Sequence, residues 1–115
     1  MRLDFIYVPV KELAPALALY RDSLGLDEMW REGDLTVGLG IPGTETAVML
    51  DAQAAPGSGP GPMFGVDRVD DWLAGLDAEL DILQPPSDIP GGRIMSFRDG
   101  AGNCVYVMDQ STAEG

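Results

Sequence analysis

The chain has 115 residues, no histidine and a single cysteine, Cys104. Without histidine, it lacks the commonest metal ligand, the commonest general base and the usual pH-sensitive side chain. One cysteine cannot form a disulfide within the chain and is too few for a cysteine metal cluster. These absences argue against a zinc or iron centre, and we expect Cys104 to be a small buried apolar residue rather than a nucleophile.

Basic residues are also scarce, with 7 Lys and Arg against 19 Asp and Glu, for a formal net charge of −12. Such a surface repels a phosphate backbone, so nucleic acid is not an expected partner. It favours cationic small molecules, although an acidic surface also serves simply to keep a protein soluble. No apolar run approaches the roughly 20 residues of a membrane helix, and no secretion signal is evident. We therefore expect a cytoplasmic protein without membrane contact.

The two halves of the chain repeat one another at an offset of 56 positions. With 45% hydrophobic and 23% charged residues the chain should be globular, and its length allows one domain or two small lobes that share an interface. Apolar residues at helical spacing in the first half coincide with apolar residues in the second. The matched positions are Leu13, Leu17, Tyr20 and Leu24 in the first half and Val69, Leu73, Leu76 and Leu80 in the second.

Each half predicts a strand, a helix and three further strands. The first module, residues 1–52, is separated by a Pro- and Gly-rich linker, 53–62, from the second module, 63–110, and residues 111–115 should form a frayed tail. In the first module we expect strands at Leu3–Val10, Leu26–Arg31, Leu35–Leu39 and Thr46–Leu50, the last three as an antiparallel meander, and a helix at Glu12–Leu24. In the second we expect strands at Met63–Val66, Ile82–Gln84, Gly92–Arg98 and Cys104–Met108, and a helix at Val69–Leu80.

Two segments carry a family resemblance: VPVKELAPALALYRDSLGL, Val8 to Leu26, and FRDGAGNCVYVMDQ, Phe97 to Gln110. The chain resembles the vicinal oxygen chelate superfamily, which contains glyoxalase I, extradiol dioxygenases and bleomycin-resistance proteins. That family has an F-Y-x-x-x-L-G phrase in its helix, here Leu19 to Gly25, and a D-P-D-G-N hairpin, here Asp99 to Asn103. The resemblance implies an α+β fold in which two βαβββ modules form a curved mixed-sheet cup, in a homodimer.

The resemblance also places four metal-ligand positions on the first and last strands of each module, at Phe5, Leu50, Gly61 and Tyr106. The 56-residue offset independently relates Phe5 to Gly61 and Leu50 to Tyr106. None of these four side chains is a normal ligand for a divalent metal, so we expect no metal and no cofactor, and no metal-dependent glyoxalase or dioxygenase activity. Other carboxylates near strand ends, at Asp4, Asp51, Asp67 and Asp109, would suit Mg²⁺ or Ca²⁺ better than zinc or iron.

Strand alternation predicts which side chains line the cup. If Phe5 faces it, so does Tyr7, and Tyr106 and Met108 share a face of the last strand. An aromatic and methionine-lined cavity suits a flat or apolar small molecule, but the same side chains can also fill the cup as ordinary core. The predicted ligand-binding residues are Phe5, Tyr7, Trp30, Val48, Leu50, Met63, Met95, Tyr106 and Met108.

Three functions follow from these patterns. The first is a metal-free binding protein that sequesters a hydrophobic or cationic aromatic compound, as in the drug-resistance branch of the family. The second is a metal-independent enzyme, of lyase, isomerase or oxidoreductase type, that uses Tyr7 and Tyr106 as acid–base groups. The third is a dimeric interaction module without a small ligand. An open cavity of several hundred Å3 would favour the first two over the third.

Overall fold

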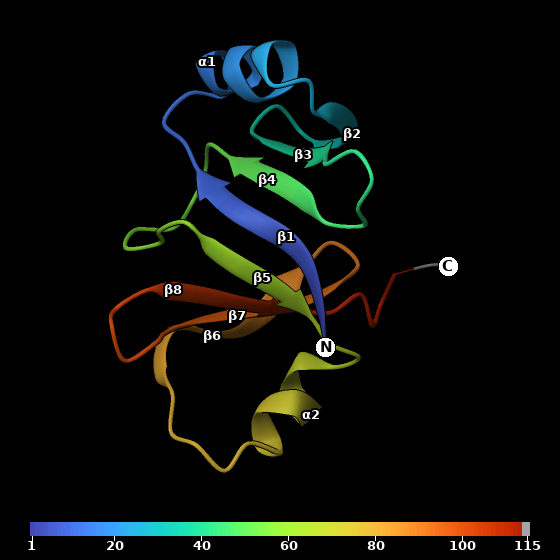
Figure 1. Ribbon diagram of the computed structural model, residues 1–115. Helices are drawn as coiled ribbons and strands as arrows, with labels where there is room; N and C mark the ends of the chain where they lie inside the picture. Colours follow the sequence, from blue (N-terminus) through green and yellow to red (C-terminus); the bar gives the residue numbers. More distant parts are fainter. Residues whose placement is uncertain (114–115) are drawn as a thin grey trace. The chain divides into compact units, whose positions relative to one another are not determined.

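The computed structural model describes residues 1–113, which form two compact units (Figure 1). The first unit is Asp4–Pro60, and the second combines Met1–Leu3 with the chain from Gly61 onward. Each unit contains four strands and a short helical segment, in the order strand, helix and three strands. The α+β class and the duplicated βαβββ arrangement predicted from the sequence are thereby confirmed.

The sheet of the first unit has the strand order β2-β3-β4-β1. Its strands are β1 (Arg2–Pro9), β2 (Asp27–Glu32), β3 (Thr36–Gly40) and β4 (Ala47–Asp51). The last three form the predicted antiparallel meander, and β1 pairs with β4 in parallel, with Tyr7 opposite Met49. The helical segment between β1 and β2 packs on one face of this sheet, which we call its helix face.

That helical segment is α1 (Leu13–Leu17) followed by a π-helical stretch, η1 (Ala18–Ser23). Leu13, Leu17 and Tyr20 pack on the sheet, as their spacing predicted. Leu24 was expected on the same stripe, but it is 61% exposed. Its amide donates to the carbonyl of Leu19, five residues back, at 2.9 Å. This wide turn holds one residue more than an α-helical turn, so it rotates Leu24 away from the buried side.

The sheet of the second unit has the strand order β5-β8-β7-β6. Its elements are β5 (Gly61–Gly65), α2 (Val69–Ala74), β6 (Asp81–Ile89), β7 (Gly92–Arg98) and β8 (Cys104–Met108). The last two strands and the hairpin between them match the prediction. Since β5 begins at Gly61, the predicted linker is two residues too long at its end.

Two predicted boundaries in the second unit are wrong. The helix ends at Ala74 rather than Leu80, because Gly75 follows and glycine is a poor helix former. Strand β6 runs through Pro85 and Pro86 to Ile89, although prolines normally exclude a strand. It is an edge strand, with β7 as its neighbour, and its pairing with β7 is irregular around the prolines, so their missing N–H groups interrupt little of the ladder.

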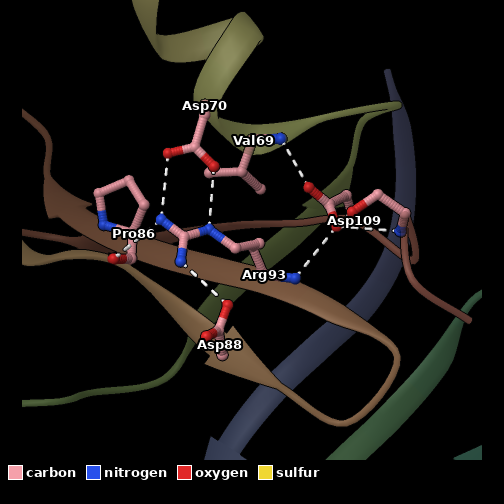
Figure 2. Close-up of polar contacts among 7 residues, drawn as sticks. Val69, Asp70, Pro86, Asp88, Arg93 and Asp109 are labelled. Atoms are coloured by element: carbon pink, nitrogen blue, oxygen red, sulfur yellow. Dashed lines mark hydrogen bonds and ion pairs between the residues drawn. The ribbon is translucent and has the colours of Figure 1, made fainter.

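The start of α2 is anchored by the buried carboxylate of Asp109 (Figure 2). One oxygen accepts the Val69 amide at 2.7 Å, and the other accepts the Arg93 amide at 3.0 Å and the Ser111 hydroxyl at 2.8 Å. The residues after Gln110 were predicted to fray, but Ser111 is held in this way and the Thr112 amide donates to Gly91. Residues 114 and 115 of the predicted tail lie outside the described residues. Within residues 1–113, no helix is long and apolar enough to cross a membrane.

Candidate functional site

The face of the first sheet opposite α1 carries a group of aromatic and polar side chains, which we call the aromatic face. The rings of Phe5 and Trp30 meet edge to face, with centroids 5.9 Å apart and planes at 90°. The Tyr7 hydroxyl donates to a carboxylate oxygen of Asp51. Both rings of the Phe5–Trp30 pair are only partly buried, so their surfaces are open to contact. The aromatic face consists of Phe5, Tyr7, Trp30, Thr36, Gly38, Met49 and Asp51.

Glycine at position 38 makes room for the Trp30 indole. Trp30 is paired with Gly38 across the β2–β3 ladder. A Cβ added at Gly38 would overlap the indole ring, so any other residue there would displace it. The missing side chain therefore lets Trp30 lie flat over β3, beside Phe5.

The carboxylate of Asp51 is the polar centre of the aromatic face. Besides the hydrogen bond from the Tyr7 hydroxyl, it accepts one from the Thr36 hydroxyl at 3.0 Å and one from the backbone amide of Gln53 at 3.1 Å. All three donors are neutral, and Asp51 forms no ion pair within residues 1–113. Its negative charge is held in place by hydrogen bonds but is not neutralised by a cation of the described chain.

Val48 and Leu50 were predicted to line the cup, and this orientation is wrong. Both belong to the hydrophobic cluster beneath α1, together with Leu17, on the helix face of the sheet. The error comes from a fixed 56-residue offset, which equated Leu50 with Tyr106. Tyr7 pairs with Met49 and Met63 pairs with Tyr106, separations of 42 and 43 residues, so the second module has one extra residue. A shift of one residue moves a strand's side chains to the opposite face.

The predicted residues of the second unit divide between the two faces of its sheet. Met95 packs beneath α2, with Val69 and Val107, on the face of the second unit's sheet that α2 covers. Met63 and Tyr106 are paired on adjacent strands and buried, and Met108 has the same strand parity as Tyr106. Met63, Tyr106 and Met108 therefore lie on one face of the sheet and stay predicted ligand contacts. The prediction of Met95 as a ligand contact is wrong, because its side chain packs in the core beneath α2.

Ser96 and Gly61 determine which polar contacts are available on the sheet face that carries Met63 and Tyr106. Ser96, the ladder partner of Tyr106, is 1% exposed, and its hydroxyl has no hydrogen-bond partner within the described chain. A buried hydroxyl without a partner costs free energy, so it could give one hydrogen bond to a bound molecule. At Gly61, an added Cβ would overlap the Cys104 carbonyl, so no ligating side chain fits at that family metal position. Cys104 itself is buried, as predicted.

The residues present do not fit the metal centre of the family. Of the four positions inferred from the resemblance, Leu50 faces the helix and Gly61 admits no side chain. On the aromatic face, the oxygens of Asp51 already accept three hydrogen bonds from the chain itself. Among residues 1–113, no three His, Cys, Asp or Glu side chains lie close enough together to hold a metal ion.

The polar half of the aromatic face was not predicted from the sequence. Asp51 was predicted only as a carboxylate near a strand end, and neither Thr36 nor Gly38 was predicted to belong to a site. A correct register for β4 would have placed Met49 and Asp51 on the same face as Tyr7. The alternation of β4 therefore contained this information, but the constant 56-residue offset assigned Leu50 rather than Met49 to the face of Tyr7.

Comparison with known proteins agrees with this fold. A protein from Legionella pneumophila described as an NAD-dependent benzaldehyde dehydrogenase is 19% identical, with a TM-score of 0.77 over 92% of this chain and 97% of that one. Hypothetical protein BH1468 from Bacillus halodurans C-125 is 18% identical, with a TM-score of 0.73 over 99% and 97%. Methylmalonyl-CoA epimerase from Streptomyces coelicolor is 20% identical, with a TM-score of 0.73 over 96% and 98%.

At these identities, the likeness extends to the fold and not to the activity. No curated protein matches the sequence significantly. Residues 2–107 match the Glyoxalase/Bleomycin resistance protein/Dioxygenase superfamily, nearly the whole described chain. The chain therefore belongs to that superfamily, as its helix and hairpin motifs implied.

Proposed function

We propose that this chain is a metal-free small-molecule-binding protein that captures an aromatic compound with a positive charge on its aromatic face. One observation carries the proposal: the carboxylate of Asp51 has no cationic partner in the described chain, and it shares a sheet face with the partly exposed rings of Phe5 and Trp30.

Each part of the aromatic face suits a part of such a ligand. The two rings, set at 90° to each other, offer a stacking surface and an edge to a flat aromatic group. A cationic group gains both from the ring faces and from Asp51. The net charge of −12 would raise the local concentration of cations around the protein and speed their capture.

The absence of a metal is part of this proposal. Since no histidine exists, and since neither Phe5, Gly61 and Tyr106 nor Met49, the counterpart of Tyr106 in the first unit, is a ligand for such a metal, we expect the purified protein to contain no stoichiometric transition metal. Elemental analysis measures this directly. One Zn, Ni, Fe or Mn per chain would contradict the proposal.

Binding is tested with a matched pair of ligands, the 1-methylquinolinium cation and neutral quinoline, by titration calorimetry. We expect the cation to bind more tightly than quinoline. Asp51→Asn keeps the shape of the side chain and removes its charge, so it should weaken binding of the cation about tenfold, or roughly 1.4 kcal/mol, and leave quinoline unaffected.

The control is Glu45→Gln, which makes the same change of charge at an exposed residue of the first unit and should alter neither affinity. To locate the ligand, Trp72→Phe leaves Trp30 as the only one of the two tryptophans, and its fluorescence should change on binding. The proposal fails if quinoline and its cation bind equally, or if Asp51→Asn has the same effect as Glu45→Gln.

A further inference from the structure

A second candidate site lies in the other unit, beside α2. It is a pocket of about 440 Å3, lined in part by Arg2, Val66, Asp67, Arg68, Asp71 and Trp72. A volume of this size falls in the range of pockets that hold small organic ligands. All of these residues belong to the second unit, whereas the aromatic face belongs to the first.

Three of the four charged residues that line this pocket have side chains that are unpaired within the described part of the chain. Asp67, Arg68 and Asp71 form no side-chain hydrogen bond or ion pair within residues 1–113. The neighbouring Asp70 differs, because both of its oxygens are bound by the Arg93 guanidinium, at 2.9 and 3.1 Å (Figure 2). The pocket is therefore lined by charges of both signs that are unpaired among the described residues, whereas the neighbouring carboxylate of Asp70 is already paired with Arg93.

The pocket also has an apolar part. Val66 is 8% exposed and lines it together with the indole of Trp72. The Trp72 ring stacks on Phe97, with centroids 6.3 Å apart and planes inclined by 23°. This contact with the sheet fixes the indole, which can then offer its remaining surface to a ligand ring.

The backbone that carries these side chains is held at two adjacent residues. Asp109 binds the Val69 amide, and Arg93 binds the Asp70 carboxylate (Figure 2). Arg68 and Asp71 flank this anchored pair in the sequence, so their backbone positions are set before any ligand arrives. A rigid backbone lowers the conformational entropy lost on binding.

We propose that this pocket binds a small aromatic zwitterion, a molecule with a ring, an ammonium group and a carboxylate, as in an aromatic α-amino acid. A purely anionic ligand would leave Asp67 and Asp71 facing like charge, and a purely cationic one would do the same for Arg68. A zwitterion gives each sign a partner, and its ring packs against Trp72.

The experiment uses Trp30→Phe, which leaves Trp72 as the only tryptophan, and L-phenylalanine as the probe. Fluorescence of Trp72 should change saturably with L-phenylalanine. N-acetyl-L-phenylalanine lacks the ammonium group and L-phenylalaninamide lacks the carboxylate, so each should bind at least tenfold more weakly. Each of these ligands lacks one of the two charged groups. The amide matches L-phenylalanine in size, whereas the N-acetyl compound is larger by an acetyl group.

Two variants in the same background assign the contacts. Arg68→Gln should weaken L-phenylalanine about tenfold and abolish its advantage over the amide, while Asp71→Asn should abolish its advantage over the N-acetyl compound. Both residues are exposed, so circular dichroism should show an unchanged fold. Arg31→Gln, an exposed arginine of the first unit, serves as the control and should leave affinity unchanged.

The proposal is overturned if L-phenylalanine gives no saturable change, if the three probes bind equally, or if Arg68→Gln behaves like Arg31→Gln. None of these outcomes depends on Asp51, so the two proposed sites are tested separately.

Discussion

Single residues decide which face of each sheet is available for binding. Gly38 admits the Trp30 indole, Gly61 excludes a ligating side chain, and Leu50 occupies the core where the family resemblance suggested a metal position. Each effect arises from one side chain, or its absence, at a fixed position on a strand.

The orientation of Leu50 leads to a stability prediction. Because Leu50 is completely buried beneath α1, Leu50→Ala should leave a cavity and lower the free energy of unfolding by about 2–5 kcal/mol. Leu24 is 61% exposed, and Leu24→Ala should cost under about 0.5 kcal/mol. Urea denaturation of both variants measures the difference. A small loss for Leu50→Ala would mean that the residue faces solvent or an open cavity.

The helices are short, so interactions at their ends contribute much of their stability. Helix α2 has six residues, with Asp109 at its start and Gly75 directly after its end. Since a helix of this length has little stability of its own, both ends should be sensitive to mutation.

Gly75→Ala should stabilise the protein by roughly 0.4–1 kcal/mol, because alanine reduces the entropy of the unfolded chain. Gly75 has a φ of −85°, which alanine adopts without strain, and a Cβ there would make only ordinary contacts, the nearest at 3.5 Å. Gly102→Ala is the matched control, since a φ of +86° disfavours alanine. Thermal unfolding should show opposite shifts for the two variants, and equal shifts would refute this reasoning.

Asp109 predicts a dependence of stability on pH. Burial by itself would raise the pKa of Asp109, but hydrogen bonds from the backbone amides of Val69, Ser111 and Arg93 and from the Ser111 hydroxyl together lower this pKa below its ordinary value. A carboxyl with a lowered pKa in the folded state stabilises the protein above its unfolded pKa of about 3.9, and this contribution is lost as the pH falls through the folded pKa.

Asp109→Asn should therefore cost about 1–3 kcal/mol at pH 7, because the buried amides of Val69 and Arg93 lose their charged acceptor. The difference from the natural chain should shrink as the pH falls below about 4, because the carboxyl of the unfolded chain takes up a proton there while the carboxyl of the folded chain stays ionised. Denaturation curves at pH 7 and at pH 3 test this. A difference of the same size at both pH values would show that the charge of Asp109 contributes nothing.

At the scale of the whole molecule, we expect a homodimer. Each unit contributes a four-stranded sheet and one short helical segment, which give a small core. Leu19, Leu24 and Met29 are 51%, 61% and 67% exposed, so apolar surface is available for contact between copies. Sedimentation equilibrium should give twice the chain mass of 12.2 kDa. A single species of chain mass at micromolar concentration would contradict the prediction.

Local sequence was sufficient for the duplicated fold, because strand and helix periodicity and turn residues act over a few neighbouring positions. It predicted β7, β8, the meander of the first unit and the apolar stripe that runs along α1 and into η1 as far as Tyr20. It also carried the motifs through which the superfamily was correctly identified. The absence of histidine was equally a property of the sequence alone.

Tertiary structure decided the facing of β4 and the grouping of charges. The one-residue difference between the modules appears only when strands pair, and it moves Val48 and Leu50 into the core and Asp51 to the aromatic face. The pocket beside α2 joins Arg2 to Arg68, which are far apart in the chain. Periodicity describes neighbours along a chain, whereas pairing register and contacts between distant segments depend on the folded backbone.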